Sequence, residues 1–144
     1  MLLVRSGLRF EDPSEEIAFF GEIASGYRVF AGLALILGAA IFYMFHLWDP
    51  IIDPSGAEAA YRIRVYLICP LVLLTALLLL IPPLERFYEP IATFGTVAGG
   101  VGMSVICGTL ERGIDYGAAG ILLVMLFVFS MIPLRIGYFV IFCA

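Results

Sequence analysis

Apolar residues dominate this chain in long runs that short polar segments interrupt. Four runs hold about twenty residues each with almost no charge, at 29–48, 61–81, 91–110 and 116–134. At 1.5 Å per residue, twenty helical residues span about 30 Å, the thickness of a bilayer's hydrocarbon core. The pattern therefore predicts an all-α, polytopic transmembrane helical bundle with four full spans.

The only sizeable polar stretch is the N-terminal one, residues 1–28. Asp12 can cap a helix, Pro13 suits the first helical position, and Glu15 follows the cap by three residues. Apolar residues at positions 20, 23, 24 and 27 then share one helix face. We expect a cytoplasmic amphipathic helix that lies along the membrane surface or leads straight into the first span. The alternative is a poorly ordered tail.

The chain ends in a fifth apolar segment, residues 136–144. Nine helical residues reach only about 14 Å, which is too short to cross the core. The segment is either the truncated start of a fifth helix or one arm of a half-buried hairpin. Because the sequence stops abruptly among apolar residues, the first interpretation is favoured.

Within the second run, Arg62 and Arg64 fall in the first turns, where long basic side chains can reach the lipid head groups. Pro70 predicts a kink in the same helix.

The arginines also predict the orientation in the membrane. Five lie on the N-terminal side and three on the other: Arg5, Arg9, Arg28, Arg86 and Arg135 against Arg62, Arg64 and Arg112. By the positive-inside rule, this balance places the N-terminus in the cytoplasm. We expect a multi-pass membrane protein.

Composition excludes several classes of function. The chain is 62% hydrophobic and 14% charged, whereas soluble domains are nearer 45–50% and 25%. It has no Lys, Asn or Gln and a single His, which excludes a lysine Schiff base and a multi-histidine metal centre. A net charge of −4 argues against a nucleic-acid partner. No enzyme motif is present, so no catalytic residue is assigned. The three cysteines are interpreted as small buried hydrophobes.

The third run is rich in small residues at helical spacing. Gly95 and Gly99 form a GxxxG motif, and Gly100, Ser104 and Gly108 continue the small-xxx-small pattern. Small residues let two helix backbones approach closely in lipid. We expect this helix to pack centrally inside the bundle or to form the seam of a homodimer.

Several candidate metal ligands fall at the predicted outer end of the spans. His46 and Asp49 share a helix face there, and Glu111 and Asp115 lie in a loop on the same side, as do Asp53 and Glu58. Carboxylates and a neutral imidazole suit a divalent cation. In the alternative interpretation, His46 is an interfacial residue bonded to backbone or water, and the carboxylates are solvated loop charges.

Two stretches of the chain resemble a known family. They are Leu8-Arg9-Phe10-Glu11-Asp12-Pro13 with Glu16, Phe19, Phe20, Tyr43 and Asp49, and Pro133-Leu134-Arg135-Ile136 after Phe127-Val128-Phe129. Together they resemble the hexahelical membrane anchor of bacterial class III adenylate/guanylate cyclases. The resemblance implies the N-terminal part of a larger dimeric signalling protein in a bacterial inner membrane. It implies no cofactor in this chain, and Mg²⁺ or Mn²⁺ in a catalytic domain that this chain does not contain. Its membrane part would anchor the protein, promote dimerisation and receive a small ligand or divalent cation at the outer loops.

Other functions stay open. Similar six-helix regions precede diguanylate cyclase and histidine kinase modules, so the chain could be the sensor region of either. It could also be a small structural subunit of a membrane complex. A transporter is disfavoured, because the predicted spans carry no carboxylate.

Overall fold

The computed structural model describes residues 13–111 and 113–132, and every regular element within them is a helix. The main helices are α1 (Pro13–Met44), α3 (Ala57–Ile63), α4 (Cys69–Leu80), α5 (Tyr88–Thr109) and α6 (Gly113–Met131). Short elements join them: η2 (Phe45–Leu47), α2 (Asp49–Ile52), η3 (Arg64–Ile68) and η4 (Pro82–Phe87). The predicted segment 136–144 and the polar residues 1–12 lie outside the described residues.

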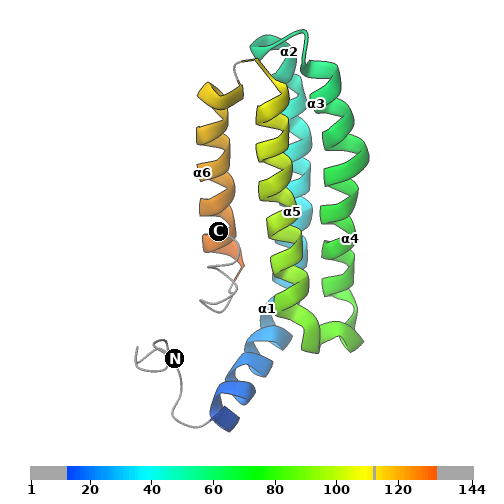
Figure 1. Ribbon diagram of the computed structural model, residues 1–144. Coiled ribbons are helices and arrows are strands. Elements are labelled where there is room, and N and C mark those ends of the chain that lie inside the picture. Colours follow the sequence, from blue (N-terminus) through cyan, green and yellow to red (C-terminus); the bar gives the residue numbers. More distant parts are fainter. Residues whose placement is uncertain (1–12, 112, 133–144) are drawn as a thin grey trace.

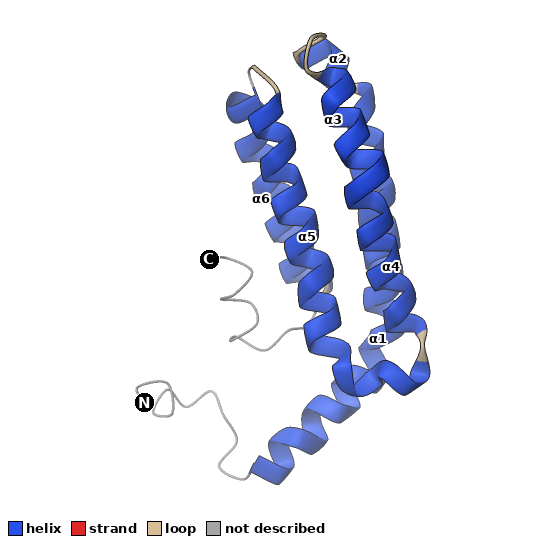
Figure 2. Ribbon diagram, turned by 45° about the vertical axis from the view of Figure 1, so that its right-hand side comes forward, coloured by secondary structure: helices blue, strands red, loops and turns tan. Residues whose placement is uncertain are grey.

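The helices stand side by side as an up-and-down bundle (Figure 1). Helix α1 rises to α2, the α3–α4 column descends, α5 rises and α6 descends. The short α2 therefore lies at the same end of the bundle as the α5–α6 connection. The N-terminal part of α1, blue in Figure 1, projects beyond the other end of the bundle. Figure 2 confirms this layout from a second direction.

Among the residues that the structure describes, three helical stretches are long and apolar enough to cross a membrane, not the four full spans that the sequence predicted. Within the described residues they are Ser25–Ile52, Ala57–Leu80 and Pro82–Thr109. The predicted fourth span coincides with α6, but α6 carries Asp115 in its first turn and ends at Met131. The acid-free part, residues 116–131, extends only about 24 Å, which falls short of a 30 Å core.

The first span continues further than Asp49-Pro50 suggested. Pro50 lies in the first turn of α2, where its missing N–H is not needed, so the chain stays helical to Ile52. The connection that follows is short, because α3 already begins at Ala57. At the other end, α1 begins at Pro13 and runs without a break into the span. This is the second of the two arrangements expected for the N-terminal helix.

The kink expected at Pro70 takes the form of a wide helical turn. Pro70 has no N–H, so the carbonyl of Tyr66 lacks its normal partner four residues on. The preceding turn, η3, is a π-helix in which the Cys69 N–H donates to the carbonyl of Arg64, five residues back. Such turns occur mostly as single interruptions of α-helices, often at functional sites. Here the wide turn begins at Arg64.

The interior combines alanines with larger apolar residues, and large apolar residues also cover the surface. The buried core cluster contains Ala31, Leu35, Ala39, Ile68, Val72, Ala76, Leu79, Tyr88, Ala92 and Ile132. Large residues such as Leu33, Leu37, Leu74, Leu77, Phe94 and Leu122 are exposed. A soluble protein would hide these side chains, whereas a bilayer solvates them. The arrangement is that of a membrane bundle.

Candidate functional site

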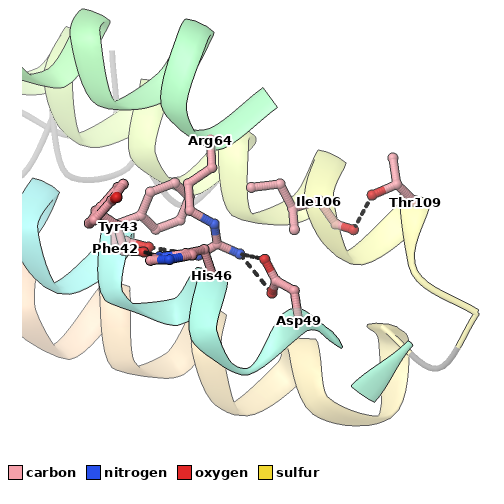
Figure 3. A network of polar contacts seen from close by, with 7 residues as sticks. All are labelled: Phe42, Tyr43, His46, Asp49, Arg64, Ile106 and Thr109. Atoms are coloured by element: carbon pink, nitrogen blue, oxygen red, sulfur yellow. Dashed lines mark hydrogen bonds and ion pairs between the residues drawn. The ribbon is translucent and has the colours of Figure 1, made fainter. Parts of the chain in front are cut away.

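A buried ion pair joins the ends of the first two spans. Nη2 of Arg64, in η3, donates to both carboxylate oxygens of Asp49, in α2, at 2.9 and 2.8 Å. The Arg64 side chain is 1% exposed and that of Asp49 is 7% exposed. A charge removed from water needs a partner of opposite sign, and each residue here supplies the other's partner. Figure 3 shows the two side chains meeting between the helices.

Arg64 has a second set of contacts on α1. Its Nη1 donates to the carbonyl of Phe42 at 2.7 Å, and its guanidinium lies 4.8 Å from the centre of the Phe42 ring. The cation therefore contacts a carboxylate, a carbonyl dipole and an aromatic face. Of the three guanidinium nitrogens of Arg64, Nη1 and Nη2 are hydrogen-bonded, and Nε alone has no partner among the described residues.

Asp53 ties together the two loops at this end. Its Oδ1 accepts from the backbone N–H of Ser55 at 2.8 Å and from the Ser55 hydroxyl. Its Oδ2 accepts from the N–H of Glu111, 58 residues away, at 3.1 Å. These bonds, the Ser55 hydroxyl first and the Glu111 N–H next, lower the pKa of Asp53 to about 2 against a smaller opposing effect of burial. One carboxylate thereby holds the α2–α3 loop to the α5–α6 connection.

A cavity of about 340 Å³ lies beside the ion pair. Asp49 and Arg64 are on its wall, and apolar side chains, a cysteine and glycines form the rest: Phe45, Trp48, Ile52, Met103, Ile106, Cys107, Leu110, Gly113, Gly117, Gly120 and Leu123. A second, smaller cavity of about 80 Å³ lies deeper in the bundle and shares Phe45 and Leu123 with the first. The charged pair thus borders an apolar space between helices.

A sequence model of MASE8, a family of membrane-associated sensor domains, matches residues 47–144. The chain belongs to the MASE8 family. The match covers more than half of the chain and includes both members of the ion pair. No curated protein and no solved structure matches the chain. MASE8 membership identifies a membrane-associated sensor domain and makes no connection to a cyclase.

The MASE8 chain does not bring the predicted cation ligands together. Asp49 is engaged by Arg64, and Nδ1 of His46 donates to the carbonyl of Tyr43 at 2.6 Å. Glu111 contributes its backbone N–H to Asp53, and Asp115 lies in the first turn of α6. Across residues 13–111 and 113–132, no three His, Cys, Asp or Glu side chains are close enough together to hold a metal ion. His46 instead makes the backbone contact of the alternative interpretation.

Arg64 does not reach the head groups, contrary to the sequence-based expectation. Arg62 does point outward: its side chain is 70% exposed and pairs with Glu58 at 2.8 Å. Side chains two residues apart on an α-helix point about 200° away from each other. Arg62 and Arg64 therefore cannot both face the same side of the helix. The spacing thus indicated that only one of the two arginines faces outward, but not which one.

Only part of the predicted small-residue motif on α5 is at a helix contact. A Cβ at Gly95 would lie 2.9 Å from Oγ1 of Thr75 on α4, whereas a Cβ at Gly99 or Gly108 would have no neighbour within 4 Å. Ser104 is exposed, and its hydroxyl donates to the carbonyl of Gly100 in the same helix. Gly95 therefore packs against α4, Gly99 on the same helix face borders the smaller cavity, and Gly108 is exposed.

Sequence reasoning missed a second glycine face, on α6. Gly113, Gly117 and Gly120 are spaced by four and three residues, which places them on one helix face. A Cβ at Gly117 would meet Sγ of Cys107, and one at Gly120 would meet the Met103 side chain. The regular spacing was visible in the sequence. These glycines let α6 lie close to α5 beside the cavity.

Proposed function

We propose that this chain is the membrane sensor region of a larger signalling protein. In this proposal, a signal at the end that holds Asp49 and Arg64 changes how the helices pack. One observation carries it: a bidentate ion pair is buried between the first two spans of an otherwise apolar bundle. Ionisable side chains inside a membrane are costly and mark functional sites.

A purely stabilising role explains the ion pair less well. Removing two charges from water costs several kcal/mol per ion, which offsets most of their attraction, and apolar pairs of similar volume stabilise as much or more. The pair does, however, fix one arrangement of α2 against η3. A signal that binds two packings with different affinities would shift the balance between them. The Arg64–Asp49 pair is the contact that such a shift would strain.

The opposite end of the bundle is suited to pass the change on. Nη1 of Arg28 on α1 donates to the carbonyl of Leu80, the last residue of α4, at 3.1 Å. Nε of Arg28 lies 3.8 Å from a carboxylate oxygen of Glu85 in η4. These contacts connect the first span to the turn that leads into α5. We propose that this end faces the cytoplasm, in a bacterial inner membrane.

The finer proposal is that the output is a nucleotidyl cyclase. The sequence resemblance supports it, and the Mg²⁺ or Mn²⁺ of the reaction belongs to the cyclase domain outside this chain. Such cyclases act as dimers, so we also propose that two copies pair through the membrane region. Ser104 and Gly108 lie four residues apart on α5 and are both exposed, and such a face of small residues is consistent with a second copy packing there.

The first experiment measures the intact mass of the natural protein and nucleotide cyclase activity in the same membranes. We expect a mass well above 15.8 kDa, and cyclic nucleotide formation that changes in an Asp49→Asn variant. Glu58→Gln is the matched control, because Glu58 also pairs with an arginine but is exposed.

The alternatives give different results. A mass near 15.8 kDa without activity would overturn the sensor proposal and indicate a structural subunit. A larger mass with kinase activity, or with a cyclic dinucleotide product, would replace the cyclase and keep the sensor.

A further inference from the structure

The cavity beside the ion pair has the features of a ligand site. Its volume of about 340 Å³ falls at the lower end of the range for small-molecule pockets, roughly 300–1,000 Å³. Its walls are apolar apart from Asp49 and Arg64. Pockets of this kind take a largely apolar molecule, and one or two polar groups fix its orientation.

The one nitrogen of Arg64 without a hydrogen-bond partner, Nε, marks where the polar part of a ligand would bind. Arg64 is 1% exposed, lies on the cavity wall, and its Nε has no partner. In a guanidinium, the Nε–H is on the same edge as Nη2, which here faces Asp49. Figure 3 shows Nε on the side of the guanidinium toward Ile106, another wall residue. A buried N–H left without an acceptor is unfavourable, so an acceptor in the cavity would be stabilised there.

The electrostatics select a neutral ligand. Asp49 already neutralises Arg64 through two hydrogen bonds at 2.9 and 2.8 Å. A second anion would leave a net negative charge in an apolar surrounding, which is costly. A carbonyl oxygen accepts a hydrogen bond without adding charge.

We propose that this cavity binds a neutral aliphatic molecule with one carbonyl oxygen, which accepts from Nε–H of Arg64. The inference names the ligand class of the proposed sensor and rests on that proposal for its biological role. The same chemistry is found in two sources, a free small ketone or lactone and the ester group of a phospholipid. Both place an aliphatic chain against the apolar wall and an oxygen at Arg64.

The test uses the protein's single tryptophan, Trp48, which lies on the cavity wall. The purified protein in phosphatidylcholine vesicles is titrated with three probes that each carry a terminal bromine: decanone, decane and decanoate. Bromine quenches tryptophan fluorescence on contact. A hydrogen bond worth about 1.4 kcal/mol corresponds to a factor of ten. We expect the ketone to bind about tenfold more tightly than the alkane, and the carboxylate to bind more weakly than the ketone.

Matched variants locate the binding. Leu123 is on the cavity wall, so Leu123→Phe should narrow the cavity and weaken ketone binding. Leu122, its neighbour, is not on the wall, so Leu122→Phe should leave binding unchanged. Arg64→Lys keeps a cation beside Asp49 but lacks the Nε–H, so the preference for ketone over alkane should disappear. If Arg64→Lys does not fold, the comparison of probes in the unaltered protein still decides the question.

Two results would overturn the proposal. Equal affinity for the ketone and the alkane would remove the role of Nε–H, and equal quenching in both leucine variants would place the probe elsewhere.

Vesicles of ester-linked and ether-linked phosphatidylcholine separate the two sources of the ligand. Ketone binding that is weaker in ester-linked lipid indicates a lipid ester as occupant, and equal binding indicates a free molecule. Because probe binding needs no output domain, intact binding without any effect on signalling would count against the proposed function alone.

Discussion

At the residue scale, Arg64 and Asp49 depend on each other. Asp49→Asn leaves a buried guanidinium without its counter-charge, and we expect it to destabilise the bundle by about 3–5 kcal/mol. Replacing both residues with apolar ones, Asp49→Leu with Arg64→Met, should restore most of that loss. Denaturant melts followed by helical circular dichroism measure both effects.

Arg62→Ala is the control for this prediction. Arg62 also pairs with an acid, Glu58, but both side chains are 70% exposed. Exposed pairs contribute about 0–1 kcal/mol, so we expect little change. If Asp49→Asn were as mild as Arg62→Ala, the pair would not be the buried contact described above.

The low pKa of Asp53 predicts that the stability of the protein depends on pH in the acid range. Its pKa is about 2 when folded, below the ordinary value of 3.8, so the unfolded chain binds a proton first as the pH falls. The stabilisation is therefore complete above about pH 4 and is lost between about pH 4 and about pH 2. Asp53→Asn should lower stability at neutral pH and remove this dependence. Melts of both proteins at several pH values across this range test the assignment. If the stability of the two proteins changes with pH in parallel, the assignment to Asp53 is wrong.

The sequence indicated the charged residues of the site but not their pairing. Asp49 was recognised as a functional candidate, and Arg64 was assigned to the head groups. Asp49 and Arg64 are 15 residues apart in the sequence. They meet because the connection between α2 and α3 is short and because the helix has a wide turn at Arg64. Hydrophobic periodicity carries no information on either. The Asp53–Glu111 contact likewise needs two loops that only the assembled bundle brings together.

At the element scale, helix positions followed from composition, because bilayer thickness fixes the length of an apolar run. Helix ends followed less well. Asp49-Pro50 looked like a stop, but a proline in a first helical turn is also a start. The apolar run at α6 is long enough to cross the hydrocarbon core only if it continues as a helix past Met131, where the described helix ends. Local chemistry at the ends, rather than hydropathy, decides such boundaries.

Two glycines of α5 should respond oppositely to substitution. Gly95→Ala places a methyl group 2.9 Å from Oγ1 of Thr75 and 3.2 Å from Cδ1 of Leu35, so we expect destabilisation. Gly99→Ala places one in open space and should stabilise the helix by about 0.5–1 kcal/mol. Thermal melts compare the two variants. If Gly99→Ala is instead as destabilising as Gly95→Ala, the space beside Gly99 is not open and this assignment is wrong.

At the scale of the whole molecule, the two ends of the bundle should lie on opposite sides of a membrane. We expect Ser55→Cys, in the loop at the Asp53 end, to react with an impermeant maleimide added outside intact cells. Pro83→Cys, exposed in η4 at the other end, should react only after the membrane is opened. The native Cys69 and Cys107 are buried and should stay silent. The reverse labelling pattern would invert the proposed orientation.

The wide turn at Arg64 also has a consequence for comparing relatives. A turn closed five residues back holds one residue more than an ordinary helical turn. A relative that lacks the proline equivalent to Pro70 could close this turn normally by losing one residue. In aligned MASE8 sequences, relatives without this proline should show a single-position gap between the positions of Arg64 and Pro70. The extra residue of the wide turn and the proline should therefore be absent together.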